Sequence, residues 1–379
     1  MKRLFLFPFL FALLWGSACN DASNPAPSPA PPQPVVGSAK LQVIKDTFEG
    51  KPIVVLGSGQ QNLAVSFFEE NEDGEALELS LSQSIGADLL QDQDGNKYNL
   101  FGIAIDGPDR GSRLRPTYGF MSYWFALPLF YEQVSIYEGT PGPVYPVPEV
   151  QDNGWLVPSN QVLASTAQDG IPSIDDPKFI SLAPTPDNST NPDLVQDNEL
   201  LIGVFIDAEL RLYPHKILDW HEIVNDQAGE VPFSLIYCPL TGTASAWVRK
   251  VDGESTTFGV SGLLYNSNVV PYDRKTGSRW SQLKEQCING EQIGNTPQML
   301  PTIETTWANW KRLFDDPPVL SFDTGFGRSY GIYPYGDYRE NHDNFLFPLL
   351  REDDRVPAKE RVHVVVINNK ARVYRFSSL

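Results

Sequence analysis

The sequence predicts an α+β protein that is predominantly antiparallel β, built from two pseudo-repeated β-rich units with a few short helices. Three observations lead to this prediction. The 379 residues include 32 Pro and 29 Gly, which interrupt the chain often. Between these breaks, Val, Leu, Ile and aromatic residues fall in short runs typical of strands, whereas helical periodicity is scarce. Segments of one half also reappear in order in the other half, as expected for an internal repeat.

The start of the chain resembles an export signal. Two basic residues precede the apolar run 4–15, which is too short to span a membrane, and small residues follow it. Cys19 comes directly after Gly-Ser-Ala, a pattern that resembles a bacterial lipobox. We therefore expect residues 1–18 to be a signal peptide that is removed, and Cys19 to be lipidated. An ordinary secretory signal with a coincidental cysteine is the alternative.

The expected lipid anchor places the protein at a membrane, facing the periplasm or on the outer membrane. Residues 19–38 form a Pro/Ala/Ser-rich tether that has too few apolar residues to fold. The β-rich part follows, and we expect a first unit at 39–140, a loop-rich connector at 141–195 and a second unit at 196–379.

The two units are predicted from an ordered series of matches. Pro52 aligns with Pro232 at an offset of 180, and Trp124 aligns with Trp307 at an offset of 183. The offset changes by only a few residues along the series, as differences in loop length would produce. One such pair could arise by chance, but an ordered series indicates duplicated structure.

Hairpins and helices can be placed within these units. Segments 203–213 and 364–374 resemble each other, and polar residues at their centres predict two β-hairpins. In 306–314, Trp307, Trp310 and Phe314 recur at helical spacing, so we expect a short helix there. A second short helix is expected around 215–220.

The charge of the chain excludes some partners. The formal net charge is −18, and removal of residues 1–18 takes away two positive charges, which gives −18 − 2 = −20. Nucleic acids and anionic lipid surfaces attract clustered Lys and Arg, which an acidic chain does not provide. We therefore expect no nucleic-acid partner, and a membrane link through the lipid alone; the oligomeric state is left open.

Candidate chemistry gathers around one thiol. Cys238 ends an apolar run at the start of a Pro- and Gly-containing turn, and His221-Glu222 stands 17 residues earlier. A thiol is reactive only as thiolate, which a base such as His221 could generate while Glu222 orients the imidazole. Thr241 and Thr243 follow the thiol and offer hydrogen-bond donors. Catalytic roles are thus assigned to Cys238, His221 and Glu222.

These motifs belong to a wider resemblance. From residue 169 onward the chain resembles a bacterial family catalogued as domain of unknown function 3179, and 50–140 look like the N-terminal portion of its longer members. The segments that carry the likeness are 220–226, 237–243, 258–268, 272–274, 278–282, 305–307 and 357–360. The resemblance implies no established activity. Many members have a second cysteine where this chain has Thr241, which argues against dithiol chemistry in this loop.

Polar and aromatic residues near these motifs could line a pocket for a small polar ligand. We assign ligand contacts to Thr241, Thr243, Asn266, Asn268, Tyr272, Asp273, Trp280 and Gln282. Turn formation by side-chain-to-backbone hydrogen bonds is the alternative explanation for several of them.

Three functions remain open from the sequence. The leading one is a periplasm-facing lipoprotein that binds a small polar ligand or a metal through a His/Glu/Cys site in its C-terminal half, since His221 and Cys238 suit zinc or copper. The second is a thiol-dependent enzyme with Cys238 as nucleophile or redox centre and His221 as general base. The third is a structural role with a Cys238–Cys287 disulfide.

Overall fold

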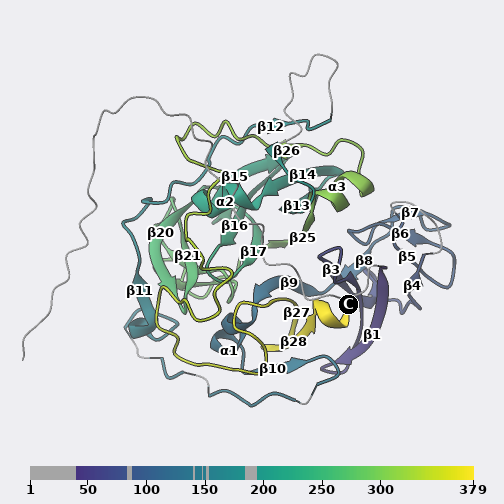
Figure 1. Ribbon diagram of the computed structural model, residues 1–379, viewed down its shortest axis with the longest axis horizontal. Coiled ribbons are helices and arrows are strands. Elements are labelled where there is room, and N and C mark those ends of the chain that lie inside the picture. The colour runs from purple at the N-terminus through teal and green to yellow at the C-terminus, as the bar shows by residue number, and fades with distance from the viewer. Residues whose placement is uncertain (1–39, 83–87, 140, 147, 151–152, 184–193) are drawn as a thin grey trace, which may run out of the picture.

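The computed structural model describes residues 40–82, 88–139, 141–146, 148–150, 153–183 and 194–379 (Figure 1). The sheets are mostly antiparallel and hold 43% of the residues in strands, whereas helices account for 9%. These proportions confirm the α+β, β-rich prediction. The expected signal peptide, lipidated Cys19 and tether lie outside the described residues. Within the described part, no helix has the length and apolar character needed to cross a membrane.

One set of three sheets has four strands in each sheet. The first has the order β1 (Gln42–Phe48), β2 (Lys51–Ser58), β3 (Leu63–Asn71), β8 (Leu114–Pro116). The second has the order β4 (Ser80–Leu81), β5 (Leu90–Gln91), β6 (Lys97–Tyr98), β7 (Ala104–Asp106). The third has the order β10 (Gln133–Ile136), β28 (Lys370–Arg375), β27 (Arg361–Ile367), β9 (Tyr118–Tyr123).

A second set follows the same scheme with added edge strands. Its first sheet has the order β15 (Ile223–Ala228), β16 (Val231–Cys238), β17 (Thr243–Val248), β24 (Met299–Leu300). Its second has the order β11 (Val162–Ala164), β20 (Phe258–Tyr265), β21 (Asn268–Asp273), β22 (Arg279–Ser281), β23 (Gln286–Asn289). Its third has the order β12 (Phe179–Ile180), β26 (Val319–Leu320), β14 (Glu209–Pro214), β13 (Leu200–Ile206), β25 (Thr302–Thr306). Strands β18 (Lys250–Val251) and β19 (Glu254–Ser255) form a small ribbon.

The last hairpin of the chain completes a sheet of the first set. β27 pairs antiparallel with β9, and β28 pairs parallel with β10. In the second set, β13 pairs antiparallel with β25, and β14 pairs parallel with β26. Figure 1 shows the yellow hairpin beside β9 and β10. The expected boundaries place 361–379 in the second unit, whereas these hydrogen bonds join it to strands of 39–140.

The predicted hairpins and helices are present. β13 and β14 are joined by Asp207-Ala208, and β27 and β28 by Asn368-Asn369; all four residues have positive φ, between 49° and 66°, as two-residue hairpin turns require. The two predicted helices are α2 (His215–His221) and α3 (Trp307–Leu313). Other helical segments of the described residues are α1 (Leu127–Phe130), η1 (Trp124–Ala126), η2 (Ser159–Gln161) and η4 (Phe376–Ser378).

Two of the hydrophobic clusters contain residues of both sets of sheets. The largest buried cluster combines Trp124 of η1, Cys238 of β16, Val269 of β21 and Val364 of β27. Each fully buried large apolar side chain stabilises the fold by about 1.5–3 kcal/mol. Because the sets are packed together in this way, rigid strands hold the side chains that line the spaces between them.

Candidate functional site

The turn that carries the predicted thiol joins β16 to β17. β16 ends at Cys238, β17 begins at Thr243, and the amide of Gly242 donates to the Cys238 carbonyl at 2.8 Å. Gly242 has φ of +61°, and a Cβ there would lie 3.1 Å from the ring of Tyr123. Glycine is therefore required both by the backbone conformation and by the neighbouring ring.

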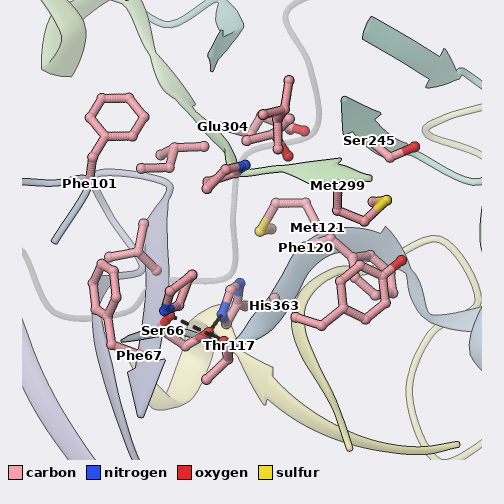
Figure 2. Close-up of a pocket in the computed structure, with 18 of the residues that line it drawn as sticks. Ser66, Phe67, Phe101, Thr117, Phe120, Met121, Ser245, Met299, Glu304 and His363 are labelled. Carbon is pink, nitrogen blue, oxygen red and sulfur yellow. Dashed lines mark hydrogen bonds between the residues drawn. The ribbon is translucent and has the colours of Figure 1, made fainter. Parts of the chain in front are cut away.

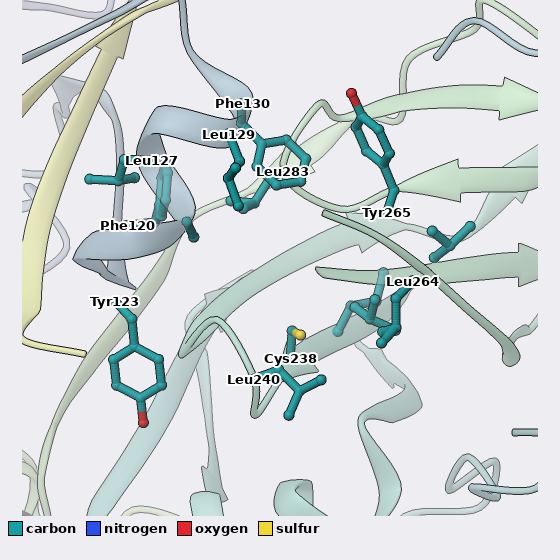
Figure 3. Close-up of a cluster of buried hydrophobic side chains, with 14 of the residues drawn as sticks. Phe120, Tyr123, Leu127, Leu129, Phe130, Cys238, Leu240, Leu264, Tyr265 and Leu283 are labelled. Carbon is teal, nitrogen blue, oxygen red and sulfur yellow. The ribbon is translucent and has the colours of Figure 1, made fainter. Parts of the chain in front are cut away.

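Cys238 lies in an apolar environment (Figure 3), with a side chain that is 1% exposed among residues such as Leu240 and Leu264. Its Sγ is directed at the carbonyl of Ser267 at 3.7 Å. Burial raises the pKa of the thiol to about 11, and the charge of Glu222 adds to this shift. The thiol therefore stays protonated at neutral pH, which does not favour a nucleophilic role.

His221, the last residue of α2, makes contacts that do not include Cys238. Its Nδ1 lies 2.8 Å from the carbonyl oxygen of Pro172, and its Nε2 lies 2.7 Å from the hydroxyl of Tyr330. Burial lowers the pKa of His221, so the ring is neutral: Nδ1–H donates to the carbonyl and Nε2 accepts from the tyrosine. Both nitrogens are thus occupied, and the hydrogen bonds of the described residues do not join His221 to Cys238.

Glu222 caps the end of α2 in a strained conformation. Its φ of +56° is unusual for a residue with a Cβ. The side chain is buried, and Tyr335 donates to its Oε1 at 3.3 Å. Burial raises the pKa of Glu222 to about 7. Glu222 lies close enough to Cys238 to raise the pKa of the thiol, whereas His221 is held by other partners.

Four of the predicted ligand contacts form one buried network. Asn268 Nδ2 and Thr243 Oγ1 both donate to Gln282 Oε1 at 2.7 Å. Thr241 Oγ1 lies 2.8 Å from Thr243 Oγ1, and Gln282 Nε2 donates to the Ile236 carbonyl at 2.8 Å. These side chains are enclosed by protein and hydrogen-bonded to one another, so in this arrangement they connect strands.

The other predicted contacts lie in turns and strand packing. Asp273 accepts from Trp280 Nε1 at 2.9 Å, and Asn266 Nδ2 donates to the Leu129 carbonyl at 3.0 Å. Tyr272 donates to Asp169 at 2.6 Å. Ligand binding by these residues stays a prediction.

Two predictions from the sequence require correction, the disulfide alternative and the metal option of the leading function. The Cys238–Cys287 disulfide is wrong, because both thiols are free and buried and they belong to different sheets, at the end of β16 and in β23. The metal site at His221 and Cys238 is also not supported. Across the described ranges, His, Cys, Asp and Glu side chains form no group of three or more that could hold a metal ion.

A cavity of about 270 Å³ lies beside α2, and we call it the α2 cavity. Its polar lining comes from the first turns of α2, from the residues before β13 and from 330–339, and includes Glu199, His215, Lys216, Asp219, Tyr333 and Arg339. No motif in the sequence singles out Asp219, Tyr333 or Arg339. Arg339 follows α2 by more than 100 residues, so the sequence does not show that the two are close in space.

The charged groups of the α2 cavity are incompletely paired. Arg339 Nη1 lies 4.0 Å from Asp219 Oδ2, and its guanidinium lies over the Tyr333 ring, 4.1 Å from the centroid. Burial raises the pKa of Asp219 to about 6, while His215 and Arg339 oppose the shift. The Tyr333 hydroxyl is buried and has no hydrogen-bond partner in the described part of the chain, whereas His215 Nε2 lies 3.4 Å from Glu304 Oε1. The Tyr333 hydroxyl is therefore available to a ligand.

A 40-residue loop, 321–360, forms one wall of this cavity and contains no strand or helix. Hydrogen bonds hold it at several points over α2 and over the turn between β16 and β17. Tyr330 bonds His221, the Ile332 carbonyl accepts from Trp220 at 3.1 Å, and Tyr338 donates to the Leu240 carbonyl at 2.9 Å. Long loops of this kind in compact proteins are often functional lids or binding loops.

Comparison with known proteins identifies one family. The model of a family described as "Protein of unknown function (DUF3179)" matches residues 168–379. Neither the curated proteins nor the solved structures give a match. The matched segment includes α2, the 321–360 loop and every lining residue of the α2 cavity.

Proposed function

The protein belongs to the family of proteins of unknown function DUF3179, and we propose that it is an exported, lipid-anchored protein that binds a small polar ligand with an anionic group in the α2 cavity. One observation carries this proposal. Arg339, Asp219 and the unpaired Tyr333 hydroxyl converge on a single cavity without satisfying one another. Ligand sites characteristically contain a few convergent polar groups with perturbed pKa values.

Arg339 supplies the positive charge that binds the anionic group of the ligand. Lys216 is already engaged, since its Nζ lies 2.7 Å from Glu199 Oε1 and 2.7 Å from the Leu194 carbonyl. Arg339 lies over the Tyr333 ring and approaches Asp219 at 4.0 Å, which is longer than a hydrogen bond, so its N–H groups can donate to a carboxylate in bidentate fashion. Asp219 and Tyr333 would then receive hydroxyl or amine groups of the same ligand.

Thiol chemistry at Cys238 is the weaker candidate. The thiol is buried, its pKa is raised to about 11, and the nitrogens of His221 are bonded to Pro172 and Tyr330. A nucleophile needs a base within hydrogen-bond reach.

The internal repeat supports the location of the site. We infer that the two sets of sheets are copies of one unit, because β10-β28-β27-β9 and β26-β14-β13-β25 share their order and directions. By the offset of 161 between the hairpins, His215 at the start of α2 corresponds to Phe376 of η4 (215 + 161 = 376). The second copy has the ionisable residues His215 and Lys216 where the first has Phe376 and Ser377.

Export and anchoring rest on the basic and apolar start of the chain and on Cys19. Metabolic labelling with a fatty acid, compared with a Cys19→Ala variant, tests the anchor. Ligand binding is tested by thermal shift of the purified protein with small carboxylates and with their neutral amides. The carboxylates should raise the melting temperature and the amides should not; equal behaviour of both would remove Arg339 as the anion-binding group.

A further inference from the structure

We propose that the protein has a second binding site, for a mostly apolar molecule that carries a hydrogen-bond-donating hydroxyl or N–H group. The site is a cavity of about 330 Å³ between the two sets of sheets, which we call the inter-sheet cavity (Figure 2). Strands β3, β8 and β9 line it from one set, and β17, β24 and β25 line it from the other. The inter-sheet cavity shares no lining residue with the α2 cavity, so this second site goes beyond the function proposed above.

The walls of the inter-sheet cavity are mostly apolar. Figure 2 shows Phe67 and Phe101 on one side, with Phe120, Met121 and Met299 across from them. Pockets of about 300–1,000 Å³ with aromatic and aliphatic walls are typical for small organic ligands. Methionine side chains adapt to the shape of a bound molecule, which suits a site for an apolar body.

Unsatisfied polar atoms indicate the second part of the ligand. Four residues that line the cavity have a buried atom without a hydrogen-bond partner in the described part of the chain: Ser245 Oγ, Glu285 Oε1, Glu304 Oε2 and His363 Nδ1. Each unsatisfied buried group costs about 1–3 kcal/mol, so their concentration around one cavity calls for a partner. Glu304 is a carboxylate, because Arg361 and His215 outweigh its burial and hold its pKa below the ordinary value; its oxygen accepts hydrogen bonds, and the ligand must therefore donate. Burial raises the pKa of Glu285 to about 7, so this group can accept or donate near neutral pH.

A fixed polar cluster holds one wall of the cavity in place. Ser66 Oγ lies 2.8 Å from His363 Nε2 and 2.6 Å from Thr117 Oγ1. A Cβ at Gly119 would lie 2.5 Å from Ser66 Oγ, so only glycine lets these three side chains meet. Burial lowers the pKa of His363 to about 3, and the imidazole is therefore neutral. The cavity thus presents a neutral ring nitrogen, an unpaired hydroxyl, the carboxylate oxygen of Glu304 and the carboxyl group of Glu285 beside aromatic walls.

The experiment uses N-phenyl-1-naphthylamine, an apolar fluorescent probe with a single N–H donor, and the purified full-length protein. We expect saturable enhancement of probe fluorescence. Met299→Trp fills the cavity and should raise the Kd at least about 10-fold, whereas Met299→Leu, which keeps the volume, should change it by less than about 3-fold. Arg339→Ala should leave probe binding unchanged, which separates this site from the α2 cavity.

Ser245→Leu provides a second filling variant in case Met299→Trp does not fold. It removes an unpaired hydroxyl, so it should keep or raise the melting temperature and still weaken probe binding at least about 10-fold. Absence of saturable binding to the wild-type protein would overturn the proposal and indicate a cavity that holds water only. Equal affinity of the folded filling variants and the wild-type protein would overturn it as well, since the probe would then bind elsewhere.

Discussion

Arg339 and Asp219 lie on the same cavity with 4.0 Å between Nη1 and Oδ2, which is longer than a hydrogen bond. The carboxyl group is almost completely buried, yet the nearby cation does not offset the loss of water, and the pKa of Asp219 is raised to about 6. A buried carboxylate without a close cation lowers the free energy of unfolding. Groups of this kind are common where a protein keeps a site open for a ligand.

The first prediction concerns pH and Asp219. The folded-state pKa is above the ordinary value of 3.8, so the stabilisation from the protonated acid is complete below pH 4 and is lost as the pH rises through about 6. Two pKa units correspond to about 3 kcal/mol. Asp219→Asn should therefore raise the free energy of unfolding by up to about 3 kcal/mol at pH 8 and have little effect at pH 4.

Denaturant titrations at both pH values measure this difference. Asp197→Asn serves as the control, because that carboxylate is exposed and pairs with Lys311 at the surface. If Asp219→Asn changes the stability equally at pH 4 and pH 8, the raised pKa is not the cause.

The second prediction concerns the reactivity of the thiols. Because Cys238 and Cys287 are buried with raised pKa values, both should react with iodoacetamide at least about 100-fold more slowly in the native protein than in denaturant. Peptide mass mapping after timed labelling gives both rates. Rapid labelling of Cys238 in the native state would restore the thiol-dependent alternative.

The third prediction separates a structural role from ligand contact at Gln282. Gln282→Leu removes an acceptor of Asn268 and Thr243 and a donor to two carbonyls. It should lower the free energy of unfolding by about 2–4 kcal/mol, because buried polar groups lose their partners. Binding of a carboxylate to the folded variant should be unchanged; a loss of binding without a loss of stability would support the ligand contact predicted from the sequence.

Many local elements could be predicted from the sequence. The turns at Asp207 and Asn368, the helix with Trp307 and Trp310, and the β-rich class depend on neighbouring residues, and they are present. The pairing of the last hairpin with β9 and β10 depends on contacts more than 200 residues apart, and local periodicity does not contain that information.

The same limit explains why the candidate site could not be predicted from the sequence. His221 and Cys238 are close in sequence, but α2 is followed by Glu222, which has positive φ, and the imidazole is bonded to Pro172 and Tyr330. Arg339 and Tyr333 come from a loop without strand or helix periodicity, so the chain offers no pattern that would place them beside Asp219.

The fourth prediction concerns the anchor of the 321–360 loop. Lys359 is buried, and its Nζ donates to the carbonyls of Tyr338 and Asn341 at 2.6 and 2.8 Å and also to that of Asn344. Lys359→Met should leave these carbonyls unpaired, cost about 2 kcal/mol or more, and increase protease cleavage within the loop. Lys370→Met is the control, since that side chain is half exposed and pairs with Glu49 at the surface. Equal cleavage of both variants would contradict the assigned anchor.

The central claim is that Arg339 binds the anionic group of a ligand in the α2 cavity. Isothermal titration calorimetry with a carboxylate identified by thermal shift tests it on the wild-type protein, on Arg339→Ala and on Arg328→Ala. Arg328 belongs to the same loop but does not line the cavity. We predict that Arg339→Ala raises the Kd at least about 30-fold, or about 2 kcal/mol, and that Arg328→Ala stays within about 3-fold of the wild type. Unchanged affinity in a folded Arg339→Ala variant would contradict the claim.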